Sequence, residues 1–171
     1  LPDGDYTVDA SVEDPAGNEG TANDEGSVDT IEPCVVVEDG SVPEASNASV
    51  SGTIDISDIS GVAAVTVGGK DITAATVANP VVITTDKGTL SVTGYDAANG
   101  VATYTYTENG TAKDHSQGDA SVIDSFIVVV RDTAGNTAMA GLDITITDTV
   151  PVAADDSNSL RESDTSVSGN V

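Results

Sequence analysis

Three blocks of sequence occur twice in this 171-residue chain, in the same order and at nearly the same spacing. A period of 117 to 119 residues is too long for one unit of a solenoid and suits a complete domain in a tandem array. We therefore predict the end of one repeat at 1–33, a whole repeat at 34–150 and the start of a third at 151–171. The paired blocks are residues 12–18 with 130–136, 29–33 with 148–151, and 48–54 with 165–171.

The whole repeat consists of short segments in which apolar and polar residues alternate, with turn residues between them. Alternation with a period of two is typical of β-strands with one buried face. The one helix candidate, residues 71–78, is rich in Thr and Val, which disfavour helices. About seven short strands without a helix predict an all-β fold, an immunoglobulin-like β-sandwich. The predicted strands are residues 49–56, 62–67, 81–85, 89–93, 101–107, 125–131 and 140–147.

The alternation also predicts which side chains face the core. Three of these strands place their largest apolar side chains on one side. Cys34 begins an apolar run and is expected to be buried or half-buried in a strand. Because it is the single cysteine, the chain can form neither an internal disulfide nor a Cys-rich zinc site. The predicted core residues are Ala102, Tyr104, Tyr106, Phe126, Val128, Val130, Leu142, Ile144 and Ile146.

The charge of the chain limits its partners. It carries 29 Asp and Glu residues against 5 Lys and Arg residues, for a formal net charge of −24. Such a charge repels nucleic acids and anionic membranes, and no apolar run is long enough to span a bilayer. We therefore expect neither a nucleic-acid partner nor membrane insertion. Because the sequence lacks an initiator Met and a signal-peptide pattern, we expect it to be part of a longer protein.

Many of the acidic residues lie at turns and repeat junctions, and 21 of the 29 are Asp, the short carboxylate common in oxygen-ligand cation sites. Several carboxylates within about 5 Å repel each other by several kcal/mol, and Ca²⁺, which accepts six to eight oxygen ligands, converts this repulsion into binding. The alternative is that these residues are solvated and maintain solubility. The candidate Ca²⁺ ligands are Asp3, Asp5, Asp14, Asn18, Asp29, Asp39, Asp132, Asn136, Asp148, Asp155 and Asp156.

Two further features of the acidic pattern are weaker. Asp55 and Asp58 form a sparse cluster at the end of the first predicted strand of the whole repeat. No EF-hand loop is present, so any site must be assembled from several loops. Catalysis is not expected, because the single histidine, His115, lies in a polar loop and no nucleophile or phosphate-binding motif is present. Carboxylate pairs arise by chance in so acidic a chain, so we predict that the protein is not an enzyme.

Several motifs resemble the long VCBS/T1SS-143-type repeats of giant RTX adhesins, which are type I secreted bacterial surface proteins. Residues 3–8 with 14–18 are similar to the end of the Ig-like repeats in the same adhesins. The resemblance implies type I secretion, display on the bacterial cell surface and Ca²⁺-dependent folding of structural extender modules. The motifs that carry it are residues 104–107, His115-x-x-Gly118-Asp119, residues 124–132 and residues 143–151.

One motif departs from the family pattern. Many family members have a denser Asp-x-Asp-Gly-Asp turn where this chain has Asp-Thr-Ala-Gly-Asn at 132–136. This difference moves the predicted Ca²⁺ sites towards the repeat junctions. The expected partners are the adjacent repeats of the same chain, together with a carbohydrate or protein ligand of the parent adhesin.

Two functions remain open from the sequence. The first is an extender in which Ca²⁺ limits bending between repeats. The second is a Ca²⁺-dependent module that binds a sugar or a peptide, for which the polar segment 108–122 is the candidate surface; that segment is equally well interpreted as a connection between strands.

Overall fold

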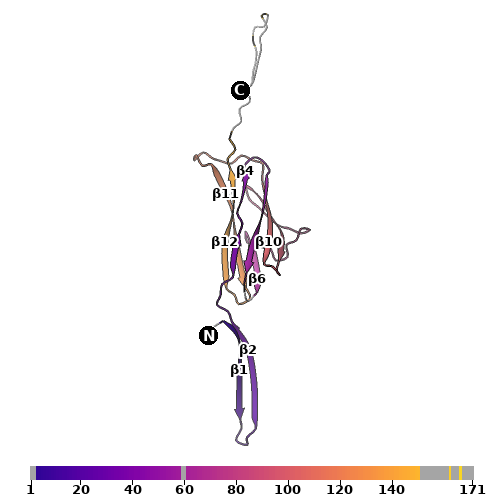
Figure 1. Ribbon diagram of the computed structural model, residues 1–171, viewed down its shortest axis with the longest axis vertical. Coiled ribbons are helices and arrows are strands. Elements are labelled where there is room, and N and C mark those ends of the chain that lie inside the picture. The colour runs from indigo at the N-terminus through magenta and orange to yellow at the C-terminus, as the bar shows by residue number, and fades with distance from the viewer. Residues whose placement is uncertain (1–2, 59–60, 151–161, 163–165, 167–171) are drawn as a thin grey trace.

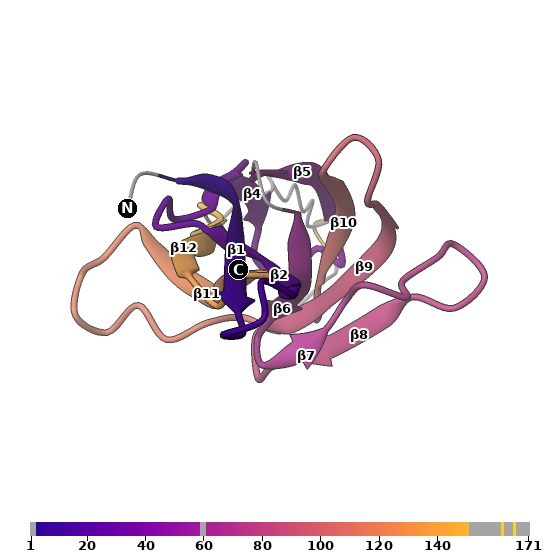
Figure 2. The ribbon, with the colours of Figure 1, turned by 90° about the horizontal axis from the view of Figure 1, so that it is seen from below.

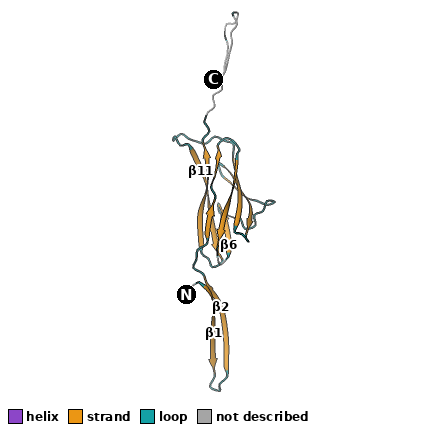
Figure 3. Cartoon of the chain, viewed as in Figure 1, coloured by secondary structure: helices purple, strands orange, loops and turns teal. Residues whose placement is uncertain are grey.

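The computed structural model describes residues 3–58, 61–150, 162 and 166, and this part of the chain contains strands but no helix (Figures 1 and 3). The strands are β1 (Gly4–Glu13), β2 (Glu19–Val28), β3 (Cys34–Val37), β4 (Gly40–Pro43), β5 (Ser49–Ser57), β6 (Val62–Val67), β7 (Lys70–Asp71), β8 (Val81–Thr84), β9 (Gly88–Asp96), β10 (Val101–Glu108), β11 (Ser121–Asp132) and β12 (Thr137–Thr147).

Ten of these strands form two five-stranded sheets. The strand order is β3-β5-β10-β9-β8 in one sheet and β4-β12-β11-β6-β7 in the other. Neighbouring strands are antiparallel except for β4, which pairs in parallel with β12. The two sheets face each other across one apolar core (Figure 2). The predicted all-β, immunoglobulin-like β-sandwich is therefore confirmed.

The core consists of the alternating apolar faces that the sequence predicts. Burying one such aliphatic or aromatic side chain stabilises a fold by about 1.5–3 kcal/mol, which makes this core the main source of stability. Tyr106 and Phe126 come from opposite sheets and meet edge to face, with 6.2 Å between their ring centroids. All nine predicted core residues are at most 3% exposed: Ala102, Tyr104, Tyr106, Phe126, Val128, Val130, Leu142, Ile144 and Ile146.

The turn between β9 and β10 requires a glycine. Gly100 has a φ of 66°, and a Cβ atom there would lie 2.0 Å from the carbonyl oxygen of Ile56. The same glycine carbonyl accepts a hydrogen bond of 2.7 Å from the amide of Ile56. This close approach explains the Asn99-Gly100 pair that marks the turn in the sequence.

Two short strands of the sandwich were not predicted, and one prediction about burial is wrong. β4 and β7 have four and two residues, too few to show a clear alternation. The strand expected at Cys34 is present as β3. Cys34 is exposed rather than buried. It begins β3, the edge strand beside β5, where Val35 and Val37 turn towards the core and Cys34 and Val36 point outwards.

Strands β1 and β2 form a hairpin of their own, which projects from the lower end of the sandwich in Figure 1. Its turn at 14–18 is closed by the same backbone hydrogen bond as the turn at 132–136 between β11 and β12. The Asp14 amide donates to the Asn18 carbonyl over 2.9 Å, and the Asp132 amide donates to the Asn136 carbonyl over 3.1 Å. The two copies of this repeated block thus adopt the same local structure.

A buried carboxylate organises the loops at the other end of the sandwich. The Oε2 atom of Glu108, at the end of β10, accepts backbone hydrogen bonds from Ser46, Asn47 and Gly110 at 3.1, 3.2 and 2.7 Å. Its Oε1 atom forms an ion pair with Lys113. Burial alone would raise the pKa of Glu108, but Lys113 and the backbone donors outweigh burial and lower the pKa to about 2.

We predict that Glu108 makes the fold sensitive to acid. Its ordinary pKa of 4.5 applies to the unfolded chain, so its contribution is complete above about pH 5 and is lost as the pH falls towards 2. Urea unfolding should show Glu108→Gln less stable than the wild type at pH 7, by at most about 3 kcal/mol, and this difference should fall below about 1 kcal/mol at pH 2.5. A stability difference that does not change between the two pH values would contradict this assignment.

Candidate metal centre

Three carboxylates meet where the β1–β2 hairpin joins the sandwich. Asp29 follows β2, Asp58 follows β5, and Asp132 ends β11 at its turn into β12. Each offers one carboxylate oxygen, and these oxygens all lie within 4.8 Å of one another. The three side chains thus come from segments that are far apart in the sequence and converge at one end of the sandwich.

The turn between β11 and β12 fixes Asp132. The Oδ1 atom of Asp132 accepts backbone hydrogen bonds from Gly135 at 2.5 Å and Asn136 at 2.7 Å, and its Oδ2 atom accepts one from Asn136 Nδ2 at 2.8 Å. Gly135 has a φ of 103°, a conformation that favours glycine. Burial would raise the pKa of Asp132, but the hydrogen bonds from Asn136 and Gly135 outweigh it and lower the pKa. Asp132 is therefore an ionised carboxylate held by three hydrogen bonds from its own turn.

Asn136 also ties the linking segment to this turn. Its Nδ2 atom lies 3.3 Å from the carbonyl oxygens of both Asp29 and Ile31, which follow the hairpin. The Asp29 Oδ1 atom accepts the Ile31 amide at 2.9 Å. The Asp29 Oδ2 atom, by contrast, is buried and has no hydrogen-bond partner among the described residues. A buried, unpaired carboxylate oxygen is costly, so this atom requires a partner that the described residues do not supply.

A cation is the partner that fits this cluster. Two carboxylates less than 4.8 Å apart repel by at least about 3 kcal/mol at an effective dielectric constant near 20. Neither Asp29 nor Asp132 forms an ion pair with another described residue. Two oxygens bound to one Ca²⁺ at 2.3–2.6 Å lie no more than about 5 Å apart, and the observed separation meets this limit. The donor set, which contains oxygen atoms only, also suits Ca²⁺.

The structure brings some of the predicted ligands together and separates others. Asp29, Asp132 and Asn136 lie in the cluster, and Asp3 and Asp5 line a shallow pocket beside it, together with Asp29. Asp3 also accepts hydrogen bonds from the Thr30 amide and hydroxyl at 3.1 and 2.8 Å.

The remaining candidates lie elsewhere. The Asp14 carboxylate accepts hydrogen bonds from the amide and side chain of Asn18 at the tip of the hairpin, and these lower its pKa. Asp39 accepts the Asp143 amide at 2.8 Å. Asp148 lies at the opposite end of β12, and Asp155 and Asp156 fall outside the described residues. The third carboxylate of the cluster is Asp58, which was not among the candidate ligands and which the sequence shows only as part of a sparse pair.

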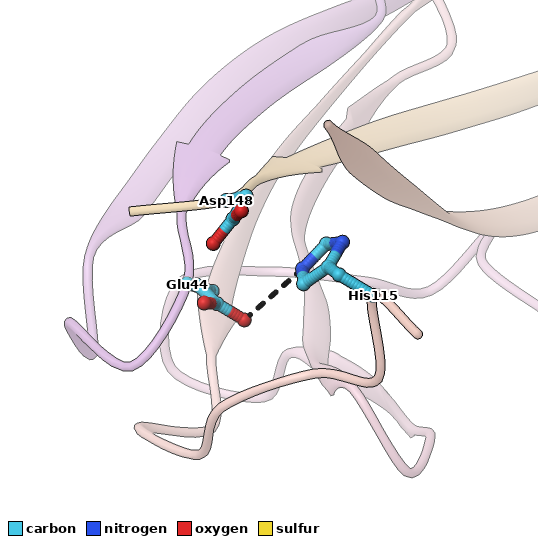
Figure 4. A group of neighbouring side chains, drawn as sticks. All are labelled: Glu44, His115 and Asp148. Carbon is cyan, nitrogen blue, oxygen red and sulfur yellow. Dashed lines mark hydrogen bonds and ion pairs between the residues drawn. The ribbon is translucent and has the colours of Figure 1, made fainter. Parts of the chain in front are cut away.

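A second cluster, at the upper end of the sandwich, contains Glu44, His115 and Asp148 (Figure 4). The His115 Nε2 atom lies 3.3 Å from Glu44 Oε2, which also accepts the Lys113 amide at 2.6 Å. The hydrogen bond from the Lys113 amide lowers the pKa of Glu44. Burial opposes this shift, and His115 adds to it. Burial opposes protonation of His115, but the hydrogen bond to Glu44 and the charges of Asp148 and Glu44 outweigh it and raise the pKa of the imidazole.

Comparison with known proteins shows only distant similarity. No family model matches the sequence, and no curated protein sequence matches it. Among solved structures, the fibronectin(III)-like modules of Clostridium thermocellum CbhA match with 16% identity and a TM-score of 0.36, over 86% of this chain and 65% of that one. Mouse clustered PcdhgC3 EC1-3 matches with 16% identity and a TM-score of 0.34, over 87% of this chain and 43% of that one.

This chain therefore spans less than two thirds of the length of either structure. The similarity is too low to transfer the role of any residue, and the fold assignment rests on the strand order described above. In the part of the chain that the structure describes, no helix is long and apolar enough to cross a membrane.

We predict that the cluster of Asp29, Asp58 and Asp132, here called the lower cluster, confers calcium-dependent stability. At a Ca²⁺ concentration 100-fold above its dissociation constant, an ion that binds only the folded state stabilises it by about 2.7 kcal/mol, which raises the melting temperature by about 5–10 °C in a domain of this size. Differential scanning calorimetry of the wild type in CaCl₂ and in chelator measures this rise. Asp58→Asn should lose most of it, because one of the three charges is removed.

The matched control is Asp55→Asn, an exposed carboxylate on β5 that lies outside the cluster. This variant should keep the full calcium response. An equal response in the Asp55→Asn and Asp58→Asn variants would show that calcium acts through general charge screening and not through the cluster.

Proposed function

We propose that this chain is a Ca²⁺-stabilised structural extender of a large bacterial cell-surface adhesin of the RTX type, and that it projects ligand-binding domains away from the cell. The sequence resemblance to adhesin repeats supports the adhesin assignment, and the carboxylate cluster between hairpin and sandwich supports the role of calcium. The observation that carries the proposal is the buried Asp29 Oδ2 atom, which has no hydrogen-bond partner within the described residues. Asp29 lies next to two further carboxylates, those of Asp58 and Asp132.

The position of the cluster suits a role in limiting bending. Asp29 belongs to the segment that joins the hairpin to the sandwich, whereas Asp58 and Asp132 belong to the sandwich itself. An ion held by all three fixes the direction in which the chain enters the sandwich. Because the sequence repeats with a period near 117 residues, the same arrangement at every junction would keep an array of such modules extended.

The proposal also accounts for the route to the cell surface. Extracellular modules typically bind Ca²⁺ with dissociation constants of about 10⁻⁴–10⁻³ M, so their sites stay empty at low cytosolic calcium and fill outside the cell. The only cysteine of the chain is exposed and cannot form an internal disulfide. After export, the folded module is therefore stabilised by the bound ion and the apolar core. In this function the chain acts as a spacer and carries out no catalysis.

The extender role predicts that calcium fixes the angle between hairpin and sandwich. Spin labels at Ala16→Cys, in the hairpin turn, and at Ile127→Cys, an exposed position on β11, in a Cys34→Ser background report this angle through pulsed electron paramagnetic resonance. We expect a narrow distance distribution in CaCl₂ and a broad one in chelator.

Asp58→Asn in the same labelled chain should remain broad in both solutions. Distributions of equal width with and without calcium in the unsubstituted chain would rule out the extender mechanism, even if calcium raises the melting temperature.

A further inference from the structure

The upper cluster differs from the lower one in its chemistry. It joins one imidazole to two carboxylates, and its members come from three separate parts of the fold: Glu44 follows β4, His115 lies in the loop between β10 and β11, and Asp148 follows β12 (Figure 4). Glu44 is only 6% exposed, and the His115 side chain is 13% exposed. These two side chains are thus held within the end of the sandwich.

A hydrogen bond outside the cluster orients the imidazole. His115 Nδ1 lies 3.0 Å from the backbone carbonyl oxygen of Asp119, which can only accept, so Nδ1 carries a proton. The Asp119 carboxylate lies 3.9 Å from the same nitrogen. In the neutral ring, Nε2 therefore presents a lone pair towards Glu44 Oε2, which is also an acceptor. Two facing acceptors require a cation between them, either a proton or a metal ion.

The geometry suits a small tetrahedral ion. In a site with metal–ligand bonds of 2.0–2.1 Å, neighbouring ligand atoms lie about 3.3–3.4 Å apart. The distance from His115 Nε2 to Glu44 Oε2 is 3.3 Å. Asp148 is exposed, and one of its carboxylate oxygens already lies within 4.8 Å of the ligand atoms of His115 and Glu44. The Asp148 amide donates a 3.0 Å hydrogen bond to the Ala120 carbonyl, which positions its backbone.

The surrounding contacts support metal ligation. A histidine that binds a metal through one ring nitrogen usually donates its other N–H to a carbonyl or carboxylate, as His115 does to Asp119. Glu44 is oriented by the Lys113 amide, and Lys113 is anchored in turn by its ion pair with Glu108. A mixed set of one imidazole and two carboxylates binds Zn²⁺ more strongly than Ca²⁺, which prefers oxygen ligands alone.

We propose that Glu44, His115 and Asp148 form a second metal centre, which takes Zn²⁺ or a related transition-metal ion and is independent of the calcium site at the lower end. The three ligands leave a coordination position for water. The bound ion fastens the loop between β10 and β11 to the ends of β4 and β12. The module thus carries an oxygen-only site at one end and a site containing nitrogen at the other.

Isothermal titration calorimetry with ZnCl₂ tests this centre. The titration is run on the full chain in a Cys34→Ser background, with excess CaCl₂ present to occupy oxygen-only sites. We expect one Zn²⁺ per chain, and we expect His115→Asn to weaken binding at least tenfold. His115 is the only histidine in the chain, so a change in its imidazole ¹⁵N resonances on addition of ZnCl₂ reports ligation directly. Co²⁺ should give the intense visible absorption of a tetrahedral site.

The matched control is Asp114→Asn, which removes a carboxylate from the same loop but outside the cluster, where Asp114 accepts the Ser116 amide. This variant should bind Zn²⁺ like the parent chain, and circular dichroism verifies that both variants are folded. Equal Zn²⁺ affinity in the His115→Asn variant and its parent, or no Zn²⁺ binding by the parent, would overturn the proposal. Neither result would affect the calcium response at Asp58, which is measured without zinc.

Discussion

Crowding of negative charge at the ends of the β-sandwich is the constraint on which the behaviour of this chain depends. Asp29, Asp58 and Asp132 place carboxylate oxygens within 4.8 Å of one another, and one Asp29 oxygen is buried without a partner in the described part of the chain. With a net charge of −24 and five Lys and Arg residues, the chain has few cations of its own to offer. We propose that an external divalent cation converts this repulsion into attraction and so couples the join between hairpin and sandwich to the ions outside.

The core of the sandwich provides the rigid frame for both ends. β12 (Thr137–Thr147) lies between Asn136 at the lower cluster and Asp148 at the upper one, and its Leu142, Ile144 and Ile146 side chains are fully buried. Eleven residues of strand place the two clusters roughly 35 Å apart, well beyond the screening length of about 8 Å at physiological salt. Ions at the two proposed sites would therefore influence each other little, while the apolar core keeps the side chains of both clusters in position.

The sequence predicts the strands and their buried faces well, because strict alternation in β10, β11 and β12 leaves one choice of core side. It does not predict β4, because a four-residue strand gains its place by pairing with β12, about 100 residues away. Asp29 and Asp132 are predicted as ligands from their positions at a junction and a turn. Their partner Asp58 and the pairing of His115 with Glu44, 71 residues earlier, depend on the arrangement of the loops in space, which local sequence patterns do not encode.

The role of calcium at the join between hairpin and sandwich is tested most directly by a crystal structure of the chain grown with millimolar CaCl₂. We expect an ion bound by Asp29, Asp58 and Asp132, with the Asp29 Oδ2 atom about 2.3–2.6 Å from it. Well-ordered density for these three side chains without an ion between them would contradict the proposed role of calcium.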